Sequence, residues 1–470
     1  MTLALYEFQR AGVSFLLHAR RAILADDMGL GKTAQAIAAC ERLRAGRVLV
    51  VCPNTLKGNW AEEIEKWVPG RHVSVLRGTR ERKEQTVRGF ARGFLVVNIE
   101  SVRRGYTKEV VGGHTKRVPS GEPGLIDGLL GVRWDVVIVD EAHGIKNRKS
   151  GQTGGVRRLA AAAEHVYLLT GTPIMNRVDE LWSPLHVLYP ARYSSFWAFV
   201  REHAVAYRGR YGWVVDGKPT RPDKLRREIA PVFLRREKEE VFPDMPRKVY
   251  QKMWLDLEGE QLRIYRDIEK TAMAQIDETT TVVTPGILAQ LTRCKQVAVS
   301  PGLIGGRPEG VKLDALMDIL LGTDQKVLVF SQFAEAIKLA AGRLREAGVG
   351  HAVFIGDTPE AERSEVIHRF QADPDVRIFL ATMQAGGSGL TLTAASLVVF
   401  LDKHWTPAMN EQAVDRTRPH MQTRPVQIIE LLGRDTVDEM IEDVLAGKVS
   451  IIEAVINKKR RSEDVRTDRS

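Results

Sequence analysis

The chain has 470 residues, of which 44% are hydrophobic and 27% charged, and its formal net charge is +10. This length exceeds what one ordinary core can organise, so we expect two or more domains. No apolar run is long enough to span a bilayer, and no signal-peptide pattern opens the sequence. Three widely spaced cysteines exclude a disulfide framework and a cysteine metal site. The positive balance favours a nucleic-acid partner only modestly, because acidic residues are spread throughout.

The first predicted elements are a strand, a glycine turn and a helix. Residues 22–25 are a short apolar run suited to a buried parallel strand, and residues 32–40 are mostly good helix formers. Between them, Gly29 and Gly31 let the backbone turn tightly and bring its N–H groups close to phosphate oxygens. The N-terminal end of the helix adds positive potential. The pattern therefore predicts a phosphate-binding turn.

Two side chains complete this predicted site. Lys32 would reach the β- and γ-phosphates of a nucleoside triphosphate, and the Thr33 hydroxyl would hold Mg²⁺. The match to G-x-x-x-x-G-K-[ST] is not strict, because Asp26 stands at the first glycine position. A chance Gly-Lys-Thr turn is the alternative, and the strand–turn–helix setting disfavours it.

A second buried strand is expected to deliver two carboxylates. Residues 134–139 are mostly apolar and precede Asp140 and Glu141, which would lie at a carboxyl end, where open α/β sheets bind ligands. We assign Asp140 to the metal and Glu141 to the attacking water. A solvated acidic pair is the alternative, and the pairing with Lys32 is what favours hydrolysis.

The rest of the first half continues the alternation of strands and helices. Further strands are expected at residues 48–51, 94–97 and 166–169, with spacings that suit crossover helices and a parallel sheet. Residues 105–131 contain many glycines and basic groups, so we expect a flexible surface insertion there. A long loop is favoured over the alternative, a segment that touches a nucleic-acid backbone.

Aromatic side chains and arginines interleave at residues 192–213. One interpretation is a surface on which bases stack. The other, which the helical spacing of Phe196, Phe199 and Val200 favours, is that these side chains face a core.

The second half repeats the α/β pattern after a charged segment, 234–248, which we expect to connect the halves. The strands expected beyond it are residues 327–330, 352–355, 378–381, 397–401 and 426–429. No second phosphate loop occurs, which suggests one nucleotide site shared between two lobes.

The order of these motifs resembles that of the Snf2-type DNA-translocating ATPases of helicase superfamily 2, over nearly the whole chain. In the first half, the similar segments are 5–16 (the adenine-reading Q motif), 27–33 (motif I), 51–60 (motif Ia), 140–147 (motif II), 169–176 (motif III) and 234–246 (interlobe segment). In the second half they are 329–333 (motif IV), 385–392 (motif V), 405–407 (its following loop), 412–416 (the start of motif VI) and 436–456 (a brace helix). The compact chain looks closest to the annealing-helicase branch, without that branch's substrate-recognition domains.

The resemblance implies an α/β fold of two RecA-like lobes, each a mainly parallel sheet flanked by helices, with helical insertions. The boundaries that we expect are 1–233 for the ATP-binding lobe, 234–260 for the connection, 261–457 for the second lobe with its brace helix, and 458–470 for a disordered basic tail. Besides the residues already named, the resemblance assigns Gln9, Asp27, Gly29, Gly31 and Gly389 to ATP, and Lys146, Thr172, Thr391 and Trp405 to the DNA.

Motif VI departs from the family pattern. In the family it carries two arginines three residues apart, which share a helix face and meet the γ-phosphate. Counted from Arg416, the second falls on Pro419, and Arg418 comes one residue early. Proline disfavours helical geometry at the preceding residue, so helical spacing does not decide where Arg418 points. We expect Arg418 to be the displaced arginine finger, the side chain that contacts the γ-phosphate. The alternative is that this arginine is lost, which lowers the catalytic rate about 10³–10⁵-fold in other phosphoryl-transfer enzymes.

The expected function is ATP-dependent translocation along double-stranded or branched DNA, with ATP and Mg²⁺, by a monomer. The compact motor suggests a bacterial or viral source and the cytoplasm, or the nucleus if the source is eukaryotic. Two alternatives stay open: a strand-separating DNA or RNA helicase, and an ATP-binding DNA clamp with little turnover. A small-molecule kinase is disfavoured, because it leaves the second lobe unexplained.

Overall fold

The computed structural model describes residues 4–103, 106–111, 114–119, 124–171, 177–209, 212–271, 273–275, 281–283, 287–359, 362–386, 390, 392–417, 422 and 424–456. The chain forms two compact units: the first takes in residues up to Val241 and those from Ser450 on, and the second runs from Phe242 to Val449. Every helix within the described residues is too short or too polar to cross a membrane.

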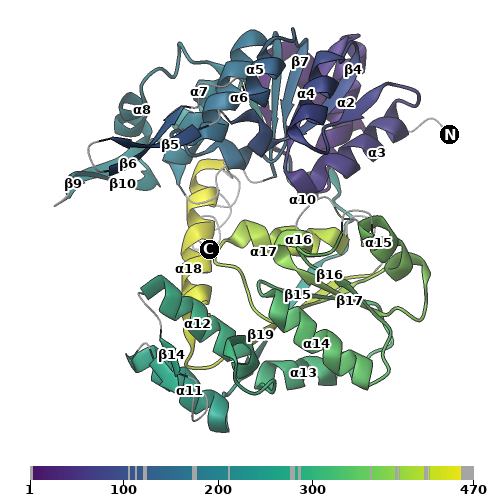
Figure 1. Ribbon diagram of the computed structural model, residues 1–470, viewed down its shortest axis with the longest axis vertical. Coiled ribbons are helices and arrows are strands. Elements are labelled where there is room, and N and C mark those ends of the chain that lie inside the picture. The colour runs from purple at the N-terminus through teal and green to yellow at the C-terminus, as the bar shows by residue number, and fades with distance from the viewer. Residues whose placement is uncertain are drawn as a thin grey trace, which may run out of the picture. The chain divides into compact units, whose positions relative to one another are not determined.

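The first unit is built on a seven-stranded parallel sheet, in the order β11-β1-β8-β7-β2-β4-β3 (Figure 1). Its strands are β1 (Arg21–Leu24), β2 (Arg47–Cys52), β3 (Val73–Val75), β4 (Gly93–Asn98), β7 (Val136–Val139), β8 (His165–Leu169) and β11 (Phe233–Leu234). The expected parallel α/β fold is confirmed, and each strand predicted in the first half overlaps one of these.

Helices cover both faces of this sheet, because alternate residues of each strand point to opposite sides. Val137 and Val139 join one apolar core, and Val136 and Ile138 join the other. The first core is closed by α4 (Arg80–Arg88), α5 (Leu125–Leu130), α6 (Gly151–Ala162) and α7 (Trp182–Leu188). The second is closed by α1 (Glu7–Ala19), α2 (Lys32–Arg42) and α3 (Lys57–Trp67).

The prediction of a long surface loop at residues 105–131 is wrong. The described part of this segment contains an antiparallel hairpin, β5 (Tyr106–Val111) with β6 (His114–Pro119), followed by α5. Ile126 and Leu129 of α5 are fully buried in the first core. The glycines and charges of the sequence concealed this short amphipathic helix.

A second insertion follows α7. It consists of α8 (Phe196–His203), the hairpin β9 (Ala204–Gly209) with β10 (Gly212–Pro219), and α9 (Pro222–Ile229). Phe199 and Val200 are buried, as their helical spacing indicated.

The second unit has a six-stranded parallel sheet in the order β12-β19-β18-β15-β17-β16 (Figure 1). Its strands are β12 (Lys248–Leu255), β15 (Val327–Ser331), β16 (His351–Phe354), β17 (Ile378–Thr382), β18 (Leu397–Phe400) and β19 (Val426–Gly433). Its helices are α11 (Gly259–Thr271), α12 (Ile287–Val299), α13 (Val311–Leu321), α14 (Ala334–Glu346), α15 (Arg363–Ala372), α16 (Met383–Gly386), α17 (Pro407–Val414) and, up to Val449, α18 (Val437–Ile456). A small hairpin is formed by β13 (Met273–Gln275) and β14 (Thr281–Val283).

Two parts of the expected connection, 234–260, belong to the two sheets. Leu234 ends β11, an edge strand of the first sheet, and residues 248–255 form β12, an edge strand of the second. Between them, the short helix α10 (Lys238–Val241) is the last element of the first unit. The charged residues and prolines concealed these edge strands, whose pairing depends on partners far along the chain.

The second unit contains a buried ion pair. Lys312 of α13 and Asp438 of α18 are 0% and 2% exposed, and their Nζ and Oδ2 atoms are 2.6 Å apart. Asp438 Oδ2 also accepts a hydrogen bond from the backbone N–H of Gly433 at 2.8 Å. The pair fixes the start of α18 against the sheet.

We expect Lys312→Met to lower the stability of the second unit by about 3–5 kcal/mol, because it leaves a buried carboxylate without its cation. Urea unfolding followed by circular dichroism measures this loss. The double variant Lys312→Met/Asp438→Asn removes both charges and should recover most of it. A single variant as stable as the parent would contradict the prediction.

Candidate functional site: a phosphate turn beside two carboxylates

The predicted glycine turn has left-handed backbone geometry. Gly29 has φ +83° and Gly31 has φ +72°, a region that favours glycine. Gly31 immediately precedes α2, and a Cβ atom there would lie 2.4 Å from Nε2 of Gln9. The turn thus needs glycine both for its backbone and for the space that Gln9 occupies.

Gln9 of α1 is buried against this turn. Its Nε2 donates to the carbonyl of Leu30 at 3.1 Å, and its Oε1 accepts from the backbone N–H of Tyr6 at 3.0 Å. The side chain therefore fixes the start of α1 to the loop that precedes α2. Its assignment to ATP stays a prediction.

Lys32, the first residue of α2, folds back over the turn. Its Nζ donates to the carbonyl oxygens of Asp26 at 2.8 Å and Asp27 at 3.1 Å. Burial lowers the pKa of the Lys32 ammonium, while Glu141 and Asp26 oppose that shift. A half-buried cation that is held by neutral carbonyls is well placed to bind phosphate oxygens.

Asp26, which breaks the strict phosphate-loop pattern, is a structural anchor. Its carboxylate is 0% exposed and forms a two-pronged pair with Arg236: Nε lies 2.9 Å from Oδ1, and Nη2 contacts Oδ2. Gln35 closes the network, since it donates to Asp26 at 3.1 Å and accepts from Arg236 at 2.8 Å. Gly12 leaves the space for it, because a Cβ there would lie 1.8 Å from Gln35 Oε1.

Asp27 is held in the same way by the neighbouring arginine. Arg235 Nη2 lies 2.9 Å from Asp27 Oδ1, and the backbone N–H of Lys238 donates to Oδ2 at 3.2 Å. Both carboxylate oxygens of Asp27 are thus engaged by the segment after β11. In this structure Asp27 positions the turn, and its assignment to ATP stays a prediction.

Asp140 and Glu141 follow β7 at the carboxyl edge of the sheet. Strand β8 separates β7 from β1, and β1 leads to the phosphate turn, so the carboxylates and the turn share one edge. Burial and the charge of Glu141 raise the pKa of Asp140 to about 6, while a hydrogen bond from Trp60 opposes the shift. Trp60 Nε1 donates to Asp140 Oδ2 at 2.8 Å.

Glu141 has left-handed backbone geometry, with φ +48°. Its Oε2 lies 3.1 Å from Nδ1 of His143. The reversal of the backbone at Glu141 separates β7 from the short turn Ala142–Ile145. A non-glycine residue in this region is strained, and such strain often occurs at functional positions.

The residue types at this edge fit Mg²⁺. A hydroxyl from Thr33 and a carboxylate from Asp140 are hard oxygen ligands of the kind that this ion prefers. The raised pKa of Asp140 also reflects neighbouring negative charge, which a divalent cation would relieve. The assignments of Thr33 and Asp140 to the metal stay predictions that this arrangement supports.

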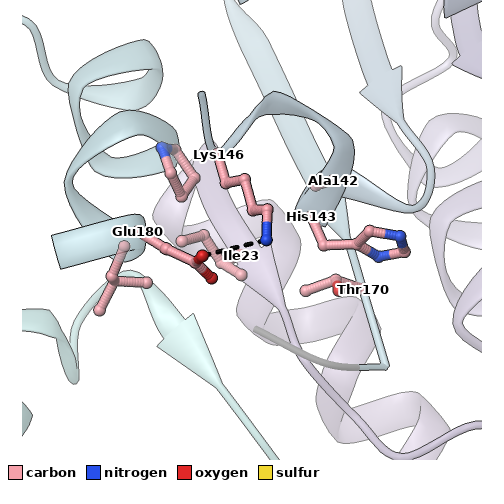
Figure 2. Close-up of a pocket in the computed structure, with 8 residues that line it drawn as sticks. Ile23, Ala142, His143, Lys146, Thr170 and Glu180 are labelled. Atoms are coloured by element: carbon pink, nitrogen blue, oxygen red, sulfur yellow. Dashed lines mark hydrogen bonds and ion pairs between the residues drawn. The ribbon is translucent and has the colours of Figure 1, made fainter. Parts of the chain in front are cut away.

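Lys146 follows the short turn Ala142–Ile145 and lines a small pocket (Figure 2). The pocket lining consists of Ile23, Ala142, His143, Lys146, Thr170, Glu180, Leu181 and Pro184. Lys146 Nζ donates to Glu180 Oε1 at 3.0 Å, and the Lys146 side chain is 37% exposed. To contact DNA, as predicted, this ammonium would have to exchange Glu180 for a phosphate.

In the second unit, α17 ends at Val414, and Arg416 lies in the short turn Asp415–Thr417. Arg416 Nη1 donates to the carbonyl of Leu390 at 3.4 Å, and the carbonyl of Arg416 accepts from Leu392 N–H at 2.8 Å. The motif V and motif VI segments are thus in contact. The predicted site residues Gly389, Thr391 and Arg418 lie outside the described residues, as does Thr172 of the first unit.

Two other side chains hold this region. Gln422 Nε2 lies 2.7 Å from the carbonyl oxygen of Thr417 and within 3.1 Å of those of Thr393 and Ala395. Lys248 of β12 pairs with Asp415 and Glu411. Burial opposes its charge, yet the two carboxylates raise the pKa of Lys248 well above its ordinary value.

Trp405, predicted to contact DNA, is half-buried in the second unit. It packs against the core formed by α11, α12 and α18, and Lys295 Nζ lies 5.5 Å from the centre of its ring. Part of the indole therefore belongs to the core. Its role towards DNA stays a prediction.

Sequence reasoning did not assign site roles to Trp60, Arg236, Gln422 or Lys248. Trp60 and Arg236 lay within segments that resemble motif Ia and the interlobe segment, so a signal for them was present. The partners of Gln422 and Lys248 are distant in sequence, and no local pattern pointed to them.

The SNF2-related domain family matches residues 8–303, and the helicase conserved C-terminal domain matches residues 311–419. The chain is 28% identical to the Bos taurus DNA annealing helicase and endonuclease ZRANB3, over 97% of this chain and 41% of that protein. It is 29% identical to the putative ATP-dependent helicase/translocase YwqA of Bacillus subtilis, over 96% of this chain and 48% of that protein. The Sulfolobus solfataricus SWI2/SNF2 ATPase core in complex with dsDNA is 25% identical, with a TM-score of 0.45, and the match covers 100% of this chain and 96% of that one. The chain spans less than half the length of these two curated relatives.

We expect Arg236→Ala to destabilise the first unit by about 3–5 kcal/mol, because it leaves the buried carboxylate of Asp26 without its cation. Thermal and urea unfolding measure the loss. Arg158→Ala is the matched control in the same unit: its pair with Asp127 is 46% and 38% exposed, so we expect a change within about 1 kcal/mol. Equal effects of the two substitutions would contradict the anchoring role of Arg236.

Proposed function

Since the chain belongs to the SNF2-related family, we propose that it hydrolyses ATP to move along duplex DNA. The observation that carries this proposal is the shared sheet edge of the first unit. There the glycine turn and Lys32 lie at the end of β1, and Asp140 and Glu141 follow β7. ATP hydrolysis requires a phosphate-binding turn together with carboxylates that hold the metal and orient the attacking water, and both lie at this edge.

The proposed chemistry divides among named groups. Backbone N–H groups of the turn and the Lys32 ammonium hold the phosphates. Thr33 and Asp140 hold Mg²⁺, which would neutralise the charge that develops on the phosphoryl oxygens. Glu141 orients the attacking water, and Nδ1 of His143 lies 3.1 Å from its Oε2.

The second unit would supply the remaining positive charge. We propose that Arg416, held between the motif V and motif VI segments, contacts the γ-phosphate. Arg418 stays our candidate for the displaced finger. Contacts to the DNA backbone position a protein without reading sequence, so we propose duplex DNA as the track, with Lys146, Thr172, Thr391 and Trp405 as candidate backbone contacts.

We expect duplex DNA to stimulate ATP turnover, and Lys32→Ala to lower the stimulated rate by about 10²–10³-fold, since it removes a charged donor to the transferring phosphoryl group. Turnover is measured without nucleic acid and with duplex DNA, single-stranded DNA and duplex RNA. Lys66→Ala, which removes a 54% exposed lysine of the same unit, should not alter the rate. ATP turnover that stays near background with every nucleic acid would contradict the translocase proposal and favour an ATP-binding DNA clamp with little turnover.

Translocation is separated from strand separation by two displacement assays. We expect the protein with ATP to displace a triplex-forming third strand and to leave a paired strand of a tailed duplex in place. Rapid separation of the tailed duplex would favour the strand-separating helicase instead.

We further expect Trp60→Phe to raise the Mg²⁺ concentration needed for half-maximal turnover about 10-fold, because the donor that orients Asp140 is lost while an aromatic ring, although a smaller one, remains. Trp67→Phe is the control: it lies on the same helix and loses a similar hydrogen bond, to Glu63 at 3.0 Å. An unchanged Mg²⁺ dependence for Trp60→Phe would remove the positioning role.

A further inference from the structure

Exposed aromatic side chains gather on the insertion formed by α8, β9 and β10. Trp213 is 62% exposed, Tyr207 55% and Trp197 38%, whereas Phe199 of the same insertion is buried. Figure 1 shows this hairpin projecting away from the seven-stranded sheet of its unit. Large aromatic side chains that are exposed to solvent do not stabilise a core, and a group of them on one surface indicates a binding site.

The strand register determines which side chains share a face. Trp213 is paired with Arg208, and Val214 with Tyr207. Cross-strand partners lie on the same face of a hairpin, so one face carries an indole beside a guanidinium. The ring of Trp197, from α8, lies 6.3 Å from that of Trp213. The face therefore presents two indoles and an arginine together.

The uncompensated charge near this face is positive. The two carboxylates of the described insertion up to β10 each have a lysine partner: Lys218 lies 3.5 Å from Asp216, and Lys224 contacts Glu202. Within the part of the chain that the structure describes, Arg201 and Arg208 form no ion pair. A polyanion is the partner that such a surface attracts.

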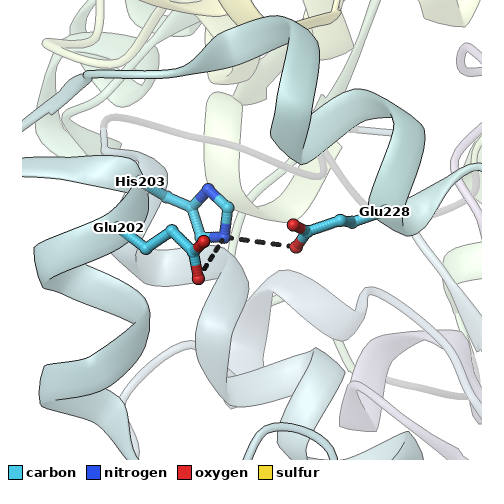
Figure 3. A group of neighbouring side chains, drawn as sticks. All are labelled: Glu202, His203 and Glu228. Atoms are coloured by element: carbon cyan, nitrogen blue, oxygen red, sulfur yellow. Dashed lines mark ion pairs between the residues drawn. The ribbon is translucent and has the colours of Figure 1, made fainter.

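The base of the hairpin is firmly held. His203, at the end of α8, is 2% exposed, and its Nε2 lies 3.3 Å from Glu228 and 3.8 Å from Glu202 (Figure 3). Thr220, just after β10, donates through its N–H to the carbonyl of His203 and through its hydroxyl to that of Glu202, both at 3.0 Å. The two ends of the hairpin are thus fastened to one cluster.

This cluster of one histidine and two glutamates already has a cation of its own. Lys224 Nζ contacts Glu202 and lies 3.9 Å from Glu228. Burial lowers the pKa of His203, against the pull of both carboxylates. A lysine already paired with both glutamates favours a structural role for the cluster over a metal site, and the cluster holds the hairpin in a fixed position.

We infer that the face formed by Trp197, Arg208 and Trp213 binds unpaired DNA bases. The indoles stack on the bases, and Arg208 contacts the phosphate backbone. This inference rests on the proposed function, because it assumes that the protein works on DNA. The inference adds a second DNA site to the first unit. This site prefers single-stranded DNA and is distinct from the proposed duplex track.

The test compares the full chain with Trp213→Ala and Trp213→Phe in binding to a single-stranded oligonucleotide, an abasic oligonucleotide of the same length and a blunt duplex. We expect Trp213→Ala to bind the single strand about 10-fold more weakly, while its affinity for the abasic strand and the duplex stays unchanged, because stacking needs bases. Trp213→Phe, which keeps a ring, should recover most of the affinity. Arg208→Ala should weaken binding to both single strands, with and without bases.

Leu321→Ala is the control for loss of an exposed apolar group, since Leu321 is 55% exposed in the second unit. It should leave all three affinities unchanged. Equal single-strand affinity for the parent and Trp213→Ala, or a parent that binds the abasic strand as well as the normal one, would overturn the inference and leave the face to another partner, such as a protein. Duplex-stimulated ATP turnover, measured on the same samples, tests the proposed function separately and should not change in Trp213→Ala.

Discussion

The first unit depends on the buried ion pair between Asp26 and Arg236. Asp26 precedes the phosphate turn, and Arg236 follows the last strand of the sheet, so one interaction joins two segments that are far apart in sequence. A fully buried carboxylate is tolerated only when it is paired and hydrogen-bonded, and Gln35 supplies the additional bonds. The phosphate turn is consequently anchored by Asp26, the residue that replaces the first glycine of the usual phosphate-loop pattern.

The two carboxylates after β7 depend on the same sheet edge. Asp140 is oriented by an indole N–H, while Glu141 is directed by a backbone reversal. Burial next to a like charge makes the negative charge of Asp140 costly, and a divalent cation, proposed to bind there, would offset this cost. The buried charge of Asp140 and the left-handed backbone of Glu141 thus lower local stability at the site where we propose ATP hydrolysis.

In the second unit, the motif VI segment extends beyond the end of helix α17, so Arg416 lies outside that helix. α17 ends at Val414, and the chain beyond it is fastened by groups from other elements: Lys248 from the edge strand β12, and Gln422 from beyond the proline. Such contacts can hold an arginine in place where helical spacing no longer does so. The loss of the regular arginine spacing therefore does not by itself imply the loss of the site.

The sequence by itself determined the parallel α/β fold, the glycine turn with Lys32, and the strand that carries Asp140, because each is encoded by neighbouring residues with a characteristic period or spacing. Tertiary structure decided what depends on residues distant in the chain. It made Asp27 an anchor paired with Arg235, turned residues 248–255 into an edge strand, and divided the aromatic segment into a buried Phe199 and an exposed Trp213. Local patterns could not show these outcomes, since charge pairing, strand pairing and exposure are properties of the surroundings that folding creates.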